Sequence, residues 1–75
     1  MSKQYSSKEI SFVLNLLGFN FVSQKGSHGK FKNIEGNITI LPMNKKEIPD
    51  STLSSILKQI KITKKEFIEI LNKNY

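Results

Sequence analysis

The stretch Lys25-Gly26-Ser27-His28-Gly29-Lys30-Phe31 decides how the middle of this chain folds. Its first three residues are predicted to form a turn, because Gly26 can take a positive φ angle. After the turn, alternation with a period of two places His28 and Lys30 on one face of a strand and Phe31 on the other. Since the phenylalanine belongs in the core, we expect the histidine and its neighbouring lysines to point outward.

Two further strands are predicted on either side of this one. The three strands are expected at residues 19–24, 28–33 and 38–41. Phe19 and Phe21 give the first strand its period of two, and in the third we expect Ile38 and Ile40 to point inward and Thr39 outward. The strands should form an antiparallel meander that is apolar on one face and polar on the other.

A first amphipathic helix is predicted over residues 7–17. It begins with a Ser6–Glu9 capping box, carries apolar residues at i, i+3, i+4 and i+7, and ends at Gly18. Phe12 and Leu16 widen its apolar face, and we assign them to the core or to a partner contact.

Two more helices are expected after the third strand. A basic loop over residues 42–49 leads into the second helix, for which Asp50 or Ser51 is the expected cap and whose apolar face should pack on the sheet. A Thr63–Glu66 capping box predicts a short last helix, with residues 72–75 frayed. The order α-β-β-β-α-α predicts an α+β fold, with one domain over residues 1–75.

The charge of the chain favours a polyanionic partner. The 75 residues carry a formal net charge of +6, and all 12 basic residues are lysine. Five of them, Lys25, Lys30, Lys32, Lys45 and Lys46, stand between residues 23 and 46, where Glu35 is the one acid. Nucleic acid is the expected polyanion. The alternative is a basic surface that serves solubility alone.

The composition also predicts the compartment. The chain has no cysteine, so it has no disulfide framework, and this fits a reducing cytoplasm. The segment Met1–Tyr5 is polar and is not expected to be a signal peptide, and no stretch approaches the length of a transmembrane helix. We therefore expect a cytoplasmic protein without a membrane partner.

His28 is the single histidine, and histidine is the usual proton-transfer group near neutral pH. Lys30 and Lys32 share its strand face and could stabilise anionic charge, while Lys25 and the amides of Gly26 and Ser27 could hold a phosphate oxygen. We expect no metal site and no cofactor, because one histidine and six acids at caps and turns do not make a ligand set. Alternatively, His28 is an incidental surface residue.

The order and spacing of these features resemble the HicA family of toxin–antitoxin messenger-RNA interferases. The resemblance is carried by Leu16-Leu17-Gly18-Phe19, Lys25-Gly26-Ser27-His28, a strand ending at Pro42, and Thr52-Leu53-Ser54-Ser55-Ile56-Leu57-Lys58-Gln59. It implies a fold like the double-stranded-RNA-binding domain, with helices on one face of the sheet. The sequence departs from many relatives at Gly29 and Asn44, where a histidine or, at the first position, a bulky residue is frequent.

The resemblance also implies an activity and a partner. The activity is cleavage of messenger RNA, which slows translation and growth, and the catalytic histidine maps onto His28. The partner is a HicB-type antitoxin that covers the His28 face, so the toxin is expected alone as a monomer or with the antitoxin as a hetero-oligomer. Two rival functions remain open, namely a non-catalytic RNA-binding module of the same fold and a domain that binds only protein.

Overall fold

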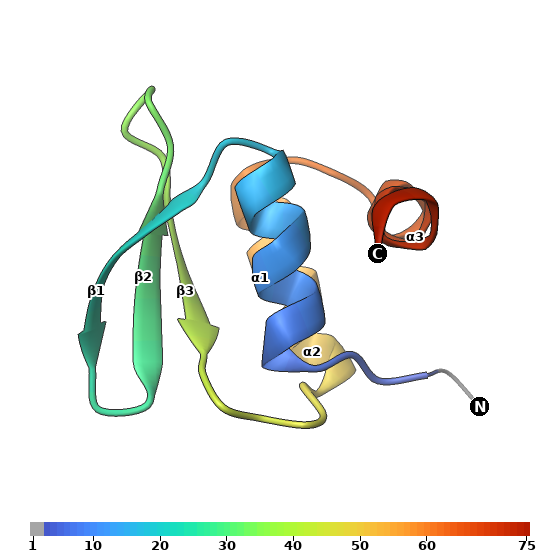
Figure 1. Cartoon of the computed structure of the whole chain (residues 1–75), viewed down its shortest axis with the longest axis horizontal. Coiled ribbons are helices and arrows are strands. Elements are labelled where there is room, and N and C mark those ends of the chain that lie inside the picture. The colour runs from blue at the N-terminus through green and yellow to red at the C-terminus, as the bar shows by residue number, and fades with distance from the viewer. Residues whose placement is uncertain (1–2) are drawn as a thin grey trace.

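The computed structural model describes residues 3–75 and contains three helices and three strands within them (Figure 1). Met1 and Ser2, the start of the segment expected not to be a signal peptide, lie outside the described residues. The elements are α1 (Ser7–Leu16), β1 (Asn20–Lys25), β2 (His28–Lys32), β3 (Ile38–Pro42), α2 (Asp50–Ile60) and α3 (Lys64–Asn74). The predicted α-β-β-β-α-α order and α+β class are confirmed.

The sheet is an antiparallel meander in the order β1-β2-β3. Helices α1 and α2 lie on one face of it, and α3 lies on the side of these two helices that is turned away from the sheet (Figure 1). Within residues 3–75, no helix lies on the opposite face of the sheet. The expected arrangement of helices on one face is therefore confirmed, whereas the likeness to the double-stranded-RNA-binding domain stays a prediction.

One apolar core joins the sheet to the helices. Phe31 from β2 is 1% exposed and Leu41 from β3 is fully buried, so both strands contribute to it. The predicted apolar stripe of α2 is buried at Leu53, Ile56 and Leu57, which confirms that this helix packs on the sheet. The remaining members come from the N-terminal segment, the loops and the other helices: Tyr5, Ile10, Val13, Leu14, Phe19, Ile48, Phe67 and Leu71.

Two of the three predicted helix starts are confirmed. Ser6 and Thr63 each form a complete capping box with the glutamate three residues later. The prediction that Asp50 or Ser51 caps α2 is wrong, because Pro49 occupies the N-cap position and provides no side-chain hydrogen bond. Extended backbone at Pro49 lets the helix start directly after the loop.

The predicted fraying of residues 72–75 is also wrong. Helix α3 continues to Asn74, whose side-chain amide donates to the carbonyl oxygen of Ile70 at 2.8 Å. The ring of Tyr75 meets the ring of Phe12 edge to face, with centroids 5.0 Å apart. This contact with α1 gives the end of α3 a tertiary partner, which a prediction based on α3 alone could not include.

Strand β3 faces the opposite way from the prediction. Thr39 is 1% exposed, whereas Ile38 and Ile40 are 41% and 43% exposed. Thr39 lies opposite Phe31 in the β2–β3 register, and residues directly opposed in antiparallel strands point to the same side. Burying Phe31 therefore buries Thr39, and the Thr39 hydroxyl donates to the side-chain oxygen of Gln59 in α2.

Strand β1 is exposed along its whole length, so its predicted apolar alternation does not hold. Phe19 is buried just before the strand begins, but Phe21 is 49% exposed and meets the Phe31 ring edge to face, at 5.7 Å between centroids. The pairing with β2 shifts register between Phe21 and Ser23, which leaves Val22 as the extra residue of a β-bulge.

Candidate functional site

His28 is the first residue of β2 and lies at the end of the sheet where β1 turns back. The β1–β2 connection has two residues between the paired Lys25 and His28. Gly26, the first of these two residues, has a φ of +59°, and the φ of Ser27 is not positive. This combination is typical of a type II′ hairpin turn. The Gln24 side-chain amide donates to the Gly26 carbonyl oxygen at 2.9 Å and braces the turn. The predicted turn at residues 25–27 is confirmed, and it fixes where the histidine emerges.

The outer face of the sheet holds His28 within a basic column. His28, Lys30 and Lys32 are exposed while Gly29 and Phe31 are buried, so the predicted alternation of β2 is confirmed. Lys25 lies directly opposite His28, where Cβ atoms stand about 5 Å apart. Along the strand, Lys30 and Lys32 are roughly 7 and 13 Å from His28. Lys25 and Lys30 are therefore close enough to share a ligand with the imidazole, and Lys32 is more distant.

The same outer face becomes apolar toward β3. Ile38 lies opposite Lys32, Ile40 opposite Lys30, and Pro42 opposite His28. The two isoleucines are each more than two-fifths exposed on this uncovered face. Strands β1, β2 and β3 contain no aspartate or glutamate. The outer face of the sheet is therefore amphipathic, with a basic centre and an apolar border.

The loop after β3 brings Lys45 and Lys46 to the His28 end of the molecule. The Met43 amide donates to the Ser27 carbonyl oxygen at 2.7 Å, so the loop starts against the β1–β2 turn. Both lysines are exposed. The predicted basic residues of turn and loop, which lie far apart in sequence, are thus brought to one end of the fold, where the loop passes the N-terminus of α1 (Figure 1).

Ser7 fastens this loop to α1. Its hydroxyl accepts a hydrogen bond from the Lys45 amide at 3.0 Å and donates one to the Pro42 carbonyl oxygen at 2.5 Å. The Ser7 amide in turn donates to the Lys45 carbonyl oxygen at 2.9 Å. Ser7 is only 4% exposed, so these bonds are shielded from water. They fix the backbone from which Lys45 and Lys46 extend.

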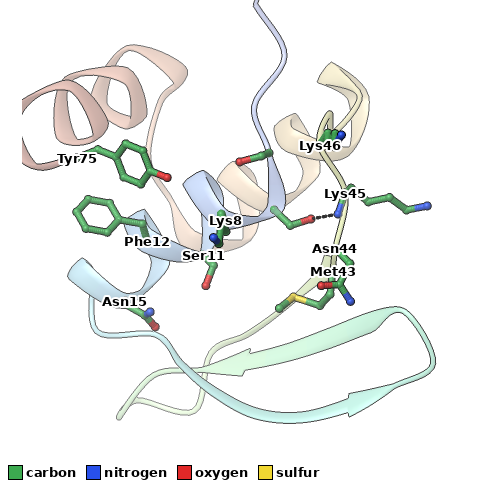
Figure 2. Close-up of a pocket in the computed structure, with 11 residues that line it drawn as sticks. Lys8, Ser11, Phe12, Asn15, Met43, Asn44, Lys45, Lys46 and Tyr75 are labelled. Carbon is green, nitrogen blue, oxygen red and sulfur yellow. Dashed lines mark hydrogen bonds between the residues drawn. The ribbon is translucent and has the colours of Figure 1, made fainter.

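A groove of about 560 Å³ separates this loop from α1 (Figure 2). Lys8, Ser11, Phe12 and Asn15 line it from α1, and Tyr75 closes it beyond Phe12. The other lining residues are Ser6, Ser7, Met43, Asn44, Lys45 and Lys46. Three lysines and no acidic residue line this groove, which favours an anionic ligand.

Gly29 lies beneath one edge of the groove. A Cβ atom at Gly29 would come within 2.8 Å of the Met43 sulfur and 3.3 Å of the Phe21 ring. The absence of a side chain there lets Met43 fold over the inner surface of β2. Because a longer side chain at this position would require Met43 to move, the glycine and the loop conformation are coupled.

The comparison with protein families was decisive for the identity of the chain. The family described as HicA toxin of bacterial toxin–antitoxin matches residues 7–62. The chain belongs to the HicA toxin family. A search of curated proteins finds no significant match.

This HicA-family chain is accordingly a toxin of a bacterial toxin–antitoxin system, and its family implies an antitoxin partner. The match includes the turn at residues 25–27, the whole sheet and α2. It ends at Ile62, one residue before the N-cap of α3, so α3 and Tyr75 lie beyond the matched region.

Sequence reasoning missed much of the groove of this HicA-family toxin. Lys8, Ser11 and Asn15 follow one another at i, i+3 and i+7, a spacing that places them on one face of α1 and could have signalled a polar binding surface. Phe12 was assigned to the core or to a partner, and the structure places it partly buried against the core at the groove's edge. Nothing in the sequence of α3 indicates that Tyr75 lines the groove.

Residues 3–75 of the toxin contain neither a membrane-spanning helix nor a cluster of metal ligands. No helix among these residues is both long and apolar enough to cross a membrane. No three His, Cys, Asp or Glu side chains in the same range gather where they could hold a metal ion. Neither ion pair found there, Lys3–Glu9 or Lys64–Asp50, involves His28.

Proposed function

We propose that this HicA-family toxin is an endoribonuclease that cleaves messenger RNA without a metal ion and thereby inhibits translation and growth. The observation that carries the proposal is an exposed imidazole at the acid-free, basic end of the sheet, in a chain of a toxin family. An RNA backbone is attracted to such a surface by its phosphates. We place the reaction in the cytoplasm, where messenger RNA is translated.

The chemistry uses the 2′-hydroxyl of the RNA as the nucleophile. A general base removes the hydroxyl proton, the 2′-oxygen bonds to the adjacent phosphorus, and the bond from phosphorus to the 5′-oxygen breaks. The leaving 5′-oxygen must receive a proton. His28 is proposed as one member of this acid–base pair, either removing the first proton or supplying the second. A water molecule or a lysine supplies the other function, because one imidazole cannot be base and acid in the same step.

The lysines near His28 have a separate role. Negative charge accumulates on the phosphoryl oxygens in the transition state, and fixed cations beside it lower the barrier. Lys25 and Lys30 are proposed for this role because Lys25 pairs with His28 across the two strands and Lys30 is the next residue on the same face of β2. The amides of Gly26 and Ser27 are proposed to bind a phosphate oxygen at the turn, while Lys32, Lys45 and Lys46 bind the flanking backbone.

The test compares wild type with a His28→Ala variant on a structured RNA in EDTA. We expect wild type to cut the RNA and the variant to bind it with little cleavage, a loss of about 10²–10⁴-fold for a general acid–base group. RNA with a 2′-deoxy substitution at the cut site should resist cleavage. If wild type and variant both bind but neither cuts, the toxin is a non-catalytic RNA-binding module. Negligible RNA binding at low salt would favour a domain that binds only protein.

We further propose that the antitoxin is of the HicB type and covers the His28 face. The supporting observation is the exposed apolar border of Ile38 and Ile40 beside Lys30 and Lys32, which fits a partner with apolar and acidic side chains. An Ile38→Asp variant should weaken the antitoxin complex, while Ile34→Asp, on a side chain in the β2–β3 turn that is fully exposed, serves as control. Equal affinity of both variants would show that the antitoxin binds elsewhere.

A further inference from the structure

The groove between α1 and the loop over residues 43–46 combines features that a single-stranded nucleic acid requires. Lys8 on one wall and Lys45 and Lys46 on the loop opposite place three cations around the groove, with the Lys45 side chain extending away from α1 (Figure 2). The rings of Phe12 and Tyr75 stand at one end, nearly perpendicular at 77°. Proteins that bind unpaired strands use the same combination, with cations along the backbone and aromatic rings on which bases stack.

The groove is also accessible and of suitable size. Tyr75 is 67% exposed and Phe12 is partly exposed, so ring surface is available to a ligand. Figure 2 shows the two aromatic rings at one end of the groove and Met43 and Asn44 at the other, with Lys8 and Ser11 between them. Its volume of about 560 Å³ lies within the range of about 300–1,000 Å³ typical of small-ligand pockets.

The polar side chains of the groove match the edges of a base. The Asn15 amide offers both hydrogen-bond donors and an acceptor, and the Ser11 hydroxyl offers one of each. In residues 3–75, no side-chain hydrogen bond involves either group. Both groups are therefore available to a ligand.

The groove lies next to the His28 site but on the other side of the sheet's end. Pro42 pairs with His28 on the outer face, and Met43, the next residue, lines the groove. A chain that passes His28 can therefore continue around the start of the loop, along Asn44 and Lys45, into the groove. The proposal below rests on this continuity and on the ribonuclease function proposed above.

We propose that the groove binds one unpaired nucleotide that flanks the bond cut at His28. Its base stacks on the Tyr75 ring and meets the nearly perpendicular Phe12 ring at its edge. Asn15 and Ser11 contact the base edge, and Lys8, Lys45 and Lys46 hold the adjoining phosphates. Because Tyr75 lies outside residues 7–62, the stacking element is an addition to the region that matches the family. The groove thus selects RNA that is single-stranded beside the cleavage point.

The test measures binding by fluorescence anisotropy with labelled oligoadenylate, in the His28→Ala background so that cleavage plays no part. Tyr75→Ala should raise the Kd about tenfold, because loss of one stacked base contact has about that effect. Tyr75→Phe keeps the ring and should stay within about twofold of the parent. Ile34→Ala, which shortens an exposed apolar side chain away from the groove, should do the same.

A second pair of variants tests the phosphate contacts. Lys8→Ala should weaken binding and reduce the slope of log K against log salt by about 0.7, the value for one phosphate contact on a single strand. Lys65→Ala is the matched control, since Lys65 is the second residue of α3 as Lys8 is of α1, and it should leave the slope unchanged. Inorganic polyphosphate should compete less well after Lys8→Ala but equally well after Tyr75→Ala.

Two results would overturn the proposal. One is oligoadenylate binding by Tyr75→Ala equal to that of the His28→Ala parent, because the ring would then contact no base. The other is an unchanged Kd for RNA together with a weakened antitoxin complex, which would make the groove a protein-binding site. Neither result bears on cleavage, which the EDTA assay on wild type and His28→Ala decides separately.

Discussion

Replacement of Ser7 by alanine tests whether the loop over residues 43–46 is fastened to α1 as the structure shows. The change removes the hydroxyl bonds to the Lys45 amide and the Pro42 carbonyl oxygen but keeps the backbone bond from the Ser7 amide to Lys45. Each intramolecular hydrogen bond contributes about 0.5–1.5 kcal/mol net. We therefore expect the loss of both bonds to lower the free energy of unfolding by about 2 kcal/mol. Removing one oxygen atom leaves almost no cavity, so we expect no further loss from packing.

Urea denaturation measures this loss directly, and for a chain of this size about 2 kcal/mol lowers Tm by about 8–16 °C. Ser55→Ala is the matched control, because its hydroxyl makes one exposed bond to the Ser51 carbonyl oxygen at 3.2 Å. Its effect should stay within about 0.5 kcal/mol. Hydrogen exchange of the Lys45 amide should also accelerate in Ser7→Ala. If Ser7→Ala unfolds at the same urea concentration as Ser55→Ala, the reasoning is refuted.

Three further predictions concern stability. Phe31→Ala should cost about 3–5 kcal/mol in urea denaturation, since the ring is 1% exposed; a loss as small as that of Lys30→Ala, expected within about 0.5 kcal/mol, would contradict the orientation of β2. Thr63→Ala should lower the free energy of unfolding by about 1 kcal/mol through loss of the α3 cap, and an unchanged Tm would show that the cap is dispensable. Gly26→Ala should cost about 1–2 kcal/mol by thermal melting, entirely from its positive φ, because nothing lies within 4 Å of the added Cβ atom.

The fold could be predicted from the sequence wherever a local pattern coincides with burial. The Ser6–Glu9 and Thr63–Glu66 boxes marked two helix starts, and the alternation around Phe31 oriented β2 correctly. These signals are local: a cap acts within one helical turn, and a single large aromatic residue sets the phase of its strand. The family resemblance carried the rest of the identification.

The error in β3 arose because two local patterns compete there. In β3, the pair Ile38 and Ile40 and the pair Thr39 and Leu41 each satisfy a period of two, and hydrophobicity alone favours the isoleucines. The register with β2 buries Thr39 and Leu41, because Thr39 pairs with the buried Phe31. Register depends on both strands, so it cannot be inferred from the sequence of β3 alone. The extra exposed apolar surface on the outer face was therefore invisible in the sequence.

Only the part of the candidate site that depends on local patterns could be predicted from the sequence. His28 and the lysines of β2 follow from strand alternation. The grouping of the loop with the β1–β2 turn depends on contacts such as Met43 with Ser27, which join distant segments. The groove depends on a still longer connection, from Phe12 in α1 to Tyr75 after α3. The spacing of residues within either helix does not predict that Phe12 and Tyr75 meet.

The bulge at Val22 has a consequence for how the toxin behaves among its own copies. Strand β1 is an uncovered edge of the sheet, and an edge strand with free backbone groups invites pairing with another chain and, from there, aggregation. The bulge interrupts the regular spacing of those groups in the middle of the strand, and Lys25 places a charge at its end. A strand from a second copy could form regular backbone hydrogen bonds with only a few residues of β1 before the bulge shifts the register. The irregularity thus protects an edge that none of the three described helices covers.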